Sequence, residues 1–131
     1  MSETISSSFL GPLLQKNYAV TVSDEPELLH ERDGQRVFWV GLNDGSALTV
    51  RLCTVHRSQE RVLADTGALF FLNQRGFPAP HLRLTVAGER VFEWQRNCWG
   101  YVQDFIEGEN PFMDLETLAE VAHLLGRLHQ M

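Results

Sequence analysis

The feature that most constrains the fold is a run of β-forming residues from Tyr18 to Thr54 that two turn signals divide into three parts. The turn signals are Asp33-Gly34 and Asn43-Asp44-Gly45, which favour tight hairpin connections because Gly and Asn tolerate left-handed backbone angles. β-Branched and aromatic residues are frequent between the turns, as is typical of strands. The sequence therefore predicts three antiparallel strands joined by short turns.

The third of these segments, ALTVRLC, indicates which side chains share a face. Successive side chains of a strand point to opposite faces of the sheet. We expect Leu48, Val50 and Leu52 to face a core, whereas Thr49 and Arg51 lie on the other face.

Helical periodicity is present on both sides of this β-rich region. Leu10, Leu13, Leu14 and Tyr18 recur at helical spacing and predict a short opening helix. After the third strand, the segment 58–76 has apolar residues along one side, with Ser58 as a candidate N-cap and Gly76 as the stop signal. A helix is therefore expected directly after the third strand.

The rest of the chain predicts more strands and a last helix. Residues 81–105 are typical of two or three strands, the first two joined at Ala87-Gly88, and residues 114–130 are typical of a helix capped by Asp114. Its apolar stripe is broad enough to need partners on two sides. The order of elements predicts an α+β fold with an antiparallel five-stranded sheet, a helix after the third strand and a C-terminal helix.

Charge and composition exclude several classes of function. The net charge of −6 gives no basic surface for nucleic acid or an anionic membrane, and no stretch reaches about 18 apolar residues. With no secretory signal, we expect a cytoplasmic protein in which Cys53 and Cys98 are reduced and packed as small hydrophobic residues. Lys16 is the single lysine, so nearly all fixed positive charge is carried by arginine.

Complete catalytic motifs are missing from the sequence. It has no phosphate-binding P-loop, dinucleotide-binding glycine motif, zinc protease motif, nucleophile elbow or paired Cys-x-x-Cys. Five histidines are scattered without ligand spacing, and a solvated or structural role explains each of them. No metal site is predicted within the chain.

The order of the segments resembles the small N-terminal lobe of the aminoglycoside phosphotransferase and choline kinase family, which has the protein kinase-like fold. The resemblance covers residues 8–130. The family's nucleotide-loop hairpin and third strand resemble ERDGQRVFWVGLNDGSALTVRL, and its next helix resembles ADTGALFFLNQRGFPAP. Its strand and hinge resemble YVQDFIEGE, and the helix after the hinge resembles LAEVAHLLGRLHQ.

The resemblance implies an ATP site. At the hinge, the carbonyl of Asp104 and the amide of Ile106 would meet adenine, and Gly108 would permit the turn toward a second lobe. An ordinary strand-to-helix turn is the alternative interpretation of this bend. Arg51 would contact the phosphates, oriented by Asp65 on the next helix, since a guanidinium can fork onto two oxygens.

Other parts of the implied site are less complete. A structural ion pair or a solvated guanidinium is the alternative role for Arg51. Thr49 on the same strand and Gly34 in the hairpin are further expected ATP contacts. The hairpin has one glycine and carries Gln35 or Arg36 where the family commonly has asparagine, so a plain Asp-Gly turn is an alternative to a phosphate-binding loop.

The family's catalytic H-G-D-x-x-x-x-N segment and its I-D-x-x-D metal-binding segment do not occur in the chain. We therefore expect residues 1–107 to form a kinase-like N-lobe and residues 108–131 to form the hinge and first helix leading toward a missing C-lobe. The C-lobe would supply the Mg²⁺ ligands and the site for an alcohol acceptor, and this chain alone would be inactive.

Two other interpretations are open at this point. One is a non-catalytic interaction module of the same fold that forms a homodimer through the exposed C-terminal helix. The other is an unrelated small α+β ligand-binding domain.

Overall fold

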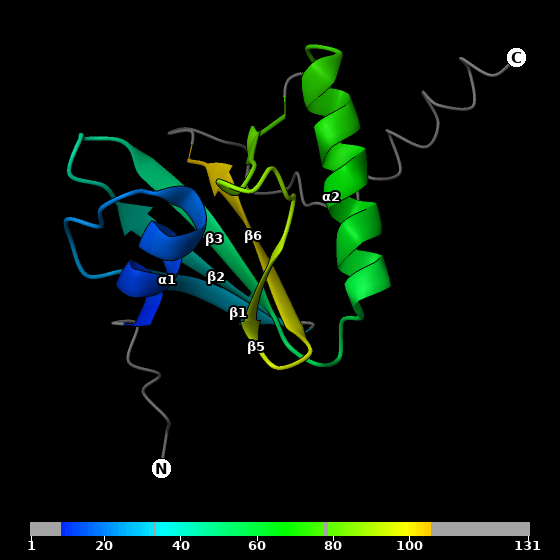
Figure 1. Cartoon of the computed structure of the whole chain (residues 1–131), viewed down its shortest axis with the longest axis horizontal. Helices are drawn as coiled ribbons and strands as arrows, with labels where there is room; N and C mark the ends of the chain where they lie inside the picture. The colour runs from blue at the N-terminus through cyan, green and yellow to red at the C-terminus, as the bar shows by residue number, and fades with distance from the viewer. Residues whose placement is uncertain (1–8, 33, 78, 106–131) are drawn as a thin grey trace, which may run out of the picture.

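The computed structural model describes residues 9–32, 34–77 and 79–105, and all structural statements below refer to them. They form a twisted antiparallel sheet with one helix on each face (Figure 1). The expected C-terminal helix and most of the expected hinge, including Ile106, lie outside the described residues. The predicted α+β class, with a helix after the third strand, is confirmed.

The first three strands form the predicted meander. Strands β1 (Glu27–Arg32), β2 (Gln35–Gly41) and β3 (Ala47–Cys53) pair antiparallel in chain order. Gly34 between β1 and β2 has a φ of +74°, and Gly45 between β2 and β3 has a φ of +91°. Both turn signals therefore mark hairpin connections that need left-handed backbone angles.

Strand β6 (Cys98–Asp104) pairs with β3 and places the C-terminal part of the described chain in the sheet centre. Two short strands, β4 (Leu82–Arg83) and β5 (Phe92–Gln95), pair with opposite ends of β6. The sheet order is β1-β2-β3-β6-β4, with β5 also on β6. The sheet thus has six strands rather than the five we expected.

Ala87-Gly88 joins the first two strands of residues 81–105, as the sequence predicted, but these two strands do not form a hairpin with each other. A tight turn does form there, with Gly88 at a φ of +82° and the amide of Thr85 donating to the carbonyl of Glu89. The strands on either side of it pair with β6 and not with each other. Because β6 is long enough for both short strands, each satisfies its backbone groups there.

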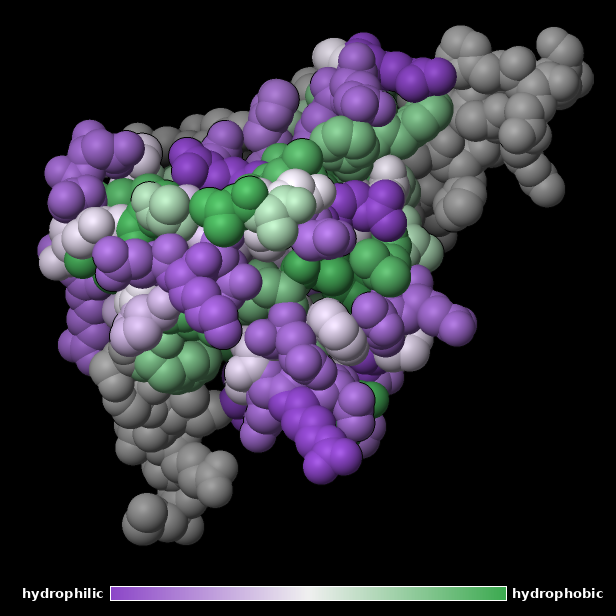
Figure 2. Space-filling view, in the orientation of Figure 1, coloured by the Kyte–Doolittle hydropathy of each residue, from purple (hydrophilic) through white to green (hydrophobic). Residues whose placement is uncertain are grey.

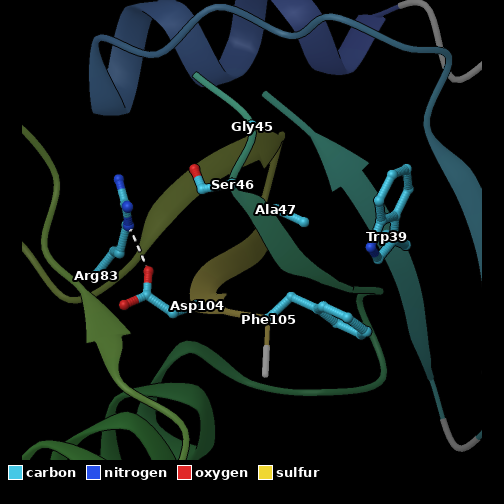
Figure 3. A pocket seen from close by; sticks show the side chains of 7 residues that line it. All are labelled: Trp39, Gly45, Ser46, Ala47, Arg83, Asp104 and Phe105. Atoms are coloured by element: carbon cyan, nitrogen blue, oxygen red, sulfur yellow. Dashed lines mark hydrogen bonds and ion pairs between the residues drawn. The ribbon is translucent and has the colours of Figure 1, made fainter. Parts of the chain in front are cut away.

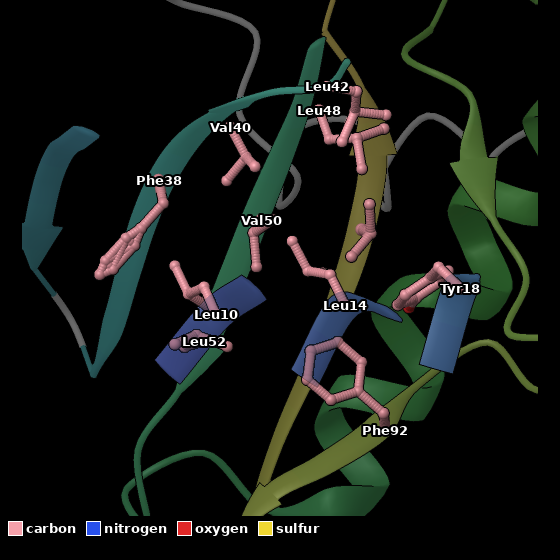
Figure 4. Packing of buried hydrophobic residues seen from close by; sticks show 11 residues of the cluster. Leu10, Leu14, Tyr18, Phe38, Val40, Leu42, Leu48, Val50, Leu52 and Phe92 are labelled. Atoms are coloured by element: carbon pink, nitrogen blue, oxygen red, sulfur yellow. The ribbon is translucent and has the colours of Figure 1, made fainter. Parts of the chain in front are cut away.

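Helix α1 (Leu10–Tyr18) covers one face of the sheet. Its buried residues Leu10, Leu14 and Tyr18 belong to the predicted helical stripe. They pack against side chains from β2, β3, β5 and β6 (Figure 4). The predicted core residues of β3 are confirmed on this face: Leu48, Val50 and Leu52 are each at most 1% exposed.

Helix α2 (Gln59–Gln74) packs on the opposite face of the sheet. The hydroxyl of Ser58 accepts a hydrogen bond from the amide of Arg61 at 3.1 Å, which confirms the predicted N-cap. After the helix, Gly76 adopts a φ of +70°, as its stop signal predicted. The helix buries an apolar face against the sheet and the segment that leads to β4. The buried hydrophobic cluster formed there contains Cys53, Val62, Leu69, Leu72, Leu82, Val91 and Tyr101.

Hydrophilic residues cover much of the face shown in Figure 2, with hydrophobic residues interspersed between them. The most exposed large apolar side chains are Val86, Val55 and Leu28, which come from different parts of the chain. None of the helices described is long and apolar enough to span a lipid bilayer.

Candidate functional site

The face of the sheet opposite α1 carries a group of polar side chains among apolar ones. Thr49 and Arg51 of β3 lie opposite Gln103 and Tyr101 of β6 in the strand register. On the other side of β3, Cys53 lies opposite Gln35 of β2. Because directly opposed residues share a face, these side chains converge on the side that Arg51 was predicted to occupy.

Arg51 is held from both neighbouring strands. Its Nε donates a hydrogen bond to Oε1 of Gln103 at 2.7 Å, and its Nη1 donates to Oε1 of Gln35 at 3.1 Å. Both glutamines are buried, with 2% and 8% of their surface exposed, whereas Arg51 is half-buried. The guanidinium is therefore ordered by two neutral amides.

A buried phenol and a buried thiol complete this group. The Nε2 of Gln35 donates to the hydroxyl of Tyr101 at 3.4 Å and lies 3.7 Å from Sγ of Cys53. Burial raises the pKa of the Tyr101 phenol and of the Cys53 thiol, and in both cases the positive charge of Arg51 opposes this shift. The phenol and thiol are thus held neutral next to the cation.

Asp65 on α2 lies near the same group but has other ion-pair partners. Its carboxylate is 3.7 Å from Arg57 Nη1 and 3.9 Å from Arg61 Nε. The negative charge of Asp65 raises the pKa of both Tyr101 and Cys53, after the larger effect of burial. Asp65 and Arg51 are therefore brought to one region, but the hydrogen bonds of Arg51 go to glutamines and not to the carboxylate that we expected.

The β1–β2 hairpin adds a titratable group to this face. His30 of β1 pairs with Val37 of β2, which in turn pairs with Arg51 of β3. The pKa of His30 is lowered from its ordinary value, first by partial burial and next by the charges of Arg51 and Arg32. His30 and Arg51 are therefore neighbours across one strand.

Gly34 in the same hairpin packs against the loop between β3 and α2. Its carbonyl accepts a hydrogen bond from the amide of Thr54 at 2.8 Å, and a Cβ at this position would come within 3.1 Å of Oγ1 of Thr54. The turn of the hairpin is therefore anchored beside the end of β3 and the start of the segment that enters α2. Its contact with ATP stays a prediction.

A hollow of about 450 Å³ opens at the other end of β3 (Figure 3). Figure 3 shows Trp39 and Phe105 on one side of Ala47 and the ion pair of Arg83 with Asp104 on the other. It is lined by Trp39, Gly45, Ser46, Ala47, Arg83, Asp104 and Phe105. Aromatic rings, a small side chain and a charged pair thus surround one open space.

The hollow and Arg51 belong to the same strand and face. Ala47, Thr49 and Arg51 alternate along β3, so Ala47 and Arg51 are about 13 Å apart at about 3.3 Å per residue. Trp39 lies opposite Thr49 in the register and reaches the hollow. Arg51 and the hollow beside the end of β6 are therefore arranged along one side of the molecule.

Asp104 is the last residue of β6, and the bend that the sequence predicts after it lies outside the described residues. Its amide donates to the carbonyl of His81 at 2.9 Å, and its carboxylate accepts a hydrogen bond from Nε of Arg83 at 2.6 Å. The next residue, Phe105, still pairs with the sheet through its amide, which donates to the carbonyl of Ala47 at 3.1 Å. The role of the Asp104 carbonyl and of Ile106 in holding adenine stays a prediction.

Sequence reasoning missed Gln103, the contact of Gln35 with Arg51 and the aromatic pair. Alternation along YVQDF places Tyr101 and Gln103 on one face, which was a usable signal, but alternation does not say which residues of another strand lie opposite. Trp39 and Phe105 are 66 positions apart, and their contact follows from the pairing of β2, β3 and β6. No short motif contains that information.

Comparison with known proteins supports the fold. No family profile and no curated protein sequence matches this chain. Solved structures do match: a spectinomycin phosphotransferase in complex with ADP and spectinomycin has a TM-score of 0.67 over 86% of the chain at 11% identity. An amicoumacin kinase in complex with AMP-PNP, Ca²⁺ and Ami has a TM-score of 0.65 over 83% of the chain at 16% identity.

This chain has a protein kinase-like fold. The predicted resemblance is thereby confirmed at the level of structure. The chain spans about a third of the length of each of these two phosphotransferases, 33% and 32% respectively. The structural match is therefore to a part of each of these two proteins.

Proposed function

We propose that this chain is the ATP-binding N-terminal lobe of a small-molecule kinase that transfers a phosphoryl group to an alcohol. The observation that carries the proposal is the arrangement of Arg51 and the aromatic hollow along one face of β3, next to the end of β6. This arrangement offers an apolar place for a nucleobase and a fixed cation for phosphate oxygens within one strand length.

The residues present fit ATP chemically. Trp39, Ala47 and Phe105 give the hollow apolar surface against which an adenine ring can pack, and Trp39 and Phe105 are aromatic. At the other end, a guanidinium has five N–H donors in a planar fork that suits phosphate oxygens. Thr49 lies between the two ends, and Gly34 and Asp65 flank the phosphate end.

Catalysis would need groups beyond this lobe. Among the described residues, no three His, Cys, Asp or Glu side chains are grouped as a metal ion would require. We propose that a second lobe, packed after the hinge, supplies the Mg²⁺ ligands, the carboxylate that orients the acceptor hydroxyl and the acceptor site. Residues 1–107 would then be the N-lobe and residues 108–131 the start of the connection.

The proposal is tested by titrating ATP with Mg²⁺ into the chain and following backbone amide shifts. We expect shifts at Ala47, Phe105 and Ile106 and around Arg51. Arg51→Ala should weaken binding roughly tenfold to a hundredfold, the range of a hydrogen bond to a charged group. Arg96→Gln is the matched control, because Arg96 is an exposed arginine in the turn before β6 and its loss changes net charge equally.

Two outcomes would contradict the proposal. One is an Arg51→Ala chain that binds ATP as tightly as the wild type. The other is a wild-type chain whose amide shifts do not respond to ATP and which dimerises with rising concentration, a result that favours the interaction module. In the full-length protein, the proposal also requires a His-Gly-Asp segment after this lobe.

A further inference from the structure

Arg51 is hydrogen-bonded to side chains from both neighbouring strands, each at a position diagonal to it in the sheet. Gln35 lies opposite Cys53, two residues after Arg51 on β3, and Gln103 lies opposite Thr49, two residues before it. The two amides therefore approach Arg51 from opposite directions along the strand. They accept from different nitrogens of the guanidinium, Nη1 and Nε. Such a two-point contact fixes the plane of the guanidinium as well as its position.

The orientation of one amide is fixed in turn. The NH₂ group of Gln35 faces the hydroxyl of Tyr101 and the sulfur of Cys53, so its oxygen is directed at Arg51. A guanidinium offers donors and no acceptor, so the amide oxygen must face it.

Both hydrogen-bond acceptors of Arg51 are neutral amides, so neither compensates its positive charge. A carboxylate at either position would cancel the positive charge at hydrogen-bond distance, and this cancellation is strong where the surroundings are partly buried. A glutamine accepts the same hydrogen bond and carries no charge. Within the described residues, two of the five N–H donors of Arg51 are engaged in this way, and neither of these hydrogen bonds neutralises its charge.

We propose that Gln35 and Gln103 are positioning residues that form a neutral clamp on Arg51, orienting it for phosphate oxygens while preserving its charge. This inference rests on the proposed function. It assigns to two amides the orienting role that the sequence analysis gave to Asp65. It also names the ligand chemistry that the clamp favours, a polyphosphate of high negative charge.

Isosteric substitution tests the clamp. Gln103→Glu keeps the acceptor oxygen and adds a charge, whereas Gln103→Leu removes the acceptor with little change of volume. ATP and inorganic tripolyphosphate are titrated into the wild-type chain and both variants at low and high salt. We expect Gln103→Glu to weaken the binding of both anions about tenfold at low salt. The difference in affinity from the wild type should be smaller at high salt, because salt screens charge.

Gln103→Leu is expected to behave differently. Without Gln103 the guanidinium is less ordered in the free chain, and ordering this long side chain on binding costs free energy. The affinity for both anions should therefore fall by about twofold to tenfold at every salt concentration. The Nε–H resonance of Arg51, expected in the wild type as a slowly exchanging signal, should be lost in this variant. If the role of Gln103 were purely structural, the two substitutions would change the melting temperature, but their losses of affinity would not differ in salt dependence.

The outcomes separate the clamp from the proposed function. If the wild type binds both anions through Arg51 but Gln103→Glu binds them equally well, the clamp is overturned and the nucleotide site stands. If the wild type binds neither anion, the proposed function fails and the clamp with it. Should Gln103→Glu fail to fold, Gln35→Glu adds a charge on the opposite side of Arg51, with Gln35→Leu as its control because both variants lose the amide donor to Tyr101 and Cys53.

Discussion

The indole ring of Trp39 and the phenyl ring of Phe105 meet edge to face, with centroids 6.5 Å apart and planes at 88°. Trp39 comes from β2, and Phe105 follows β6 on the far side of β3. The terminal ring atoms of Trp39 also cover Gly41, where a Cβ would approach to 2.9 Å. The position of the indole beside the hollow is therefore fixed by a glycine on one side and an aromatic ring on the other.

Removing Trp39 should separate base binding from phosphate binding. We expect Trp39→Ala to weaken ATP binding about tenfold, because stacking of a base on an aromatic ring contributes about 1–3 kcal/mol. Affinity for inorganic tripolyphosphate should stay unchanged, since this probe has no base. Calorimetric titration of both ligands checks the prediction, with Val86→Ala, an exposed apolar truncation, as control. Equal losses for the two ligands would contradict the assignment of the hollow to the base.

The charge of Arg51 should be measurable at His30. The pKa of His30 is lowered first by partial burial and next by Arg51, so Arg51→Gln should raise it toward its ordinary value without restoring it fully. Binding of ATP to the wild type should raise it too, because phosphate offsets the guanidinium charge. Titration of the imidazole by NMR measures both effects. Arg36→Gln is the control, since Arg36 pairs with Glu31 and lies opposite Leu52, on the other face.

The sign of the linked stability follows from this direction. A histidine whose folded pKa is depressed favours the neutral form in the native state. The stability associated with neutral His30 is therefore present above its unfolded pKa of about 6.5 and is lost as the pH falls through the folded pKa. Arg51→Gln should make this loss smaller. An unchanged pH dependence of unfolding in that variant would show that Arg51 and His30 are not coupled.

Gly100 is expected to tolerate no side chain. A Cβ there would lie 2.9 Å from the carbonyl oxygen of Arg51, 3.0 Å from Phe92 and 3.1 Å from Leu52. Gly100→Ala should therefore lower the free energy of unfolding by about 1–3 kcal/mol, as overpacking of a core does. Gly11→Ala is the matched control, because nothing lies within 4 Å of that position and alanine favours a helix by about 0.5–1 kcal/mol. Urea denaturation distinguishes the two, and a stable Gly100→Ala chain would contradict the close packing of β3 and β6.

Much of the fold followed from local patterns. The turns at Gly34 and Gly45, the Ser58 cap and the alternation of Leu48, Val50 and Leu52 all rest on residues a few positions apart, and the structure confirms them. The pairing of β4 and β5 with β6 was not predicted, because it depends on competition between strands for β6. That competition is decided by length and register rather than by the turn that joins the two strands.

The sequence by itself determined the three-strand meander, both helices within the described residues and the face of β3 on which Arg51 stands, because periodicity and turn chemistry are local. Tertiary structure alone decided that Gln35 and Gln103 hold Arg51 and that Trp39 meets Phe105. Gln35 and Gln103 are 68 positions apart in the chain. They act on one guanidinium because β2 and β6 pair with opposite edges of β3, and a register between distant strands is fixed only when the whole sheet assembles.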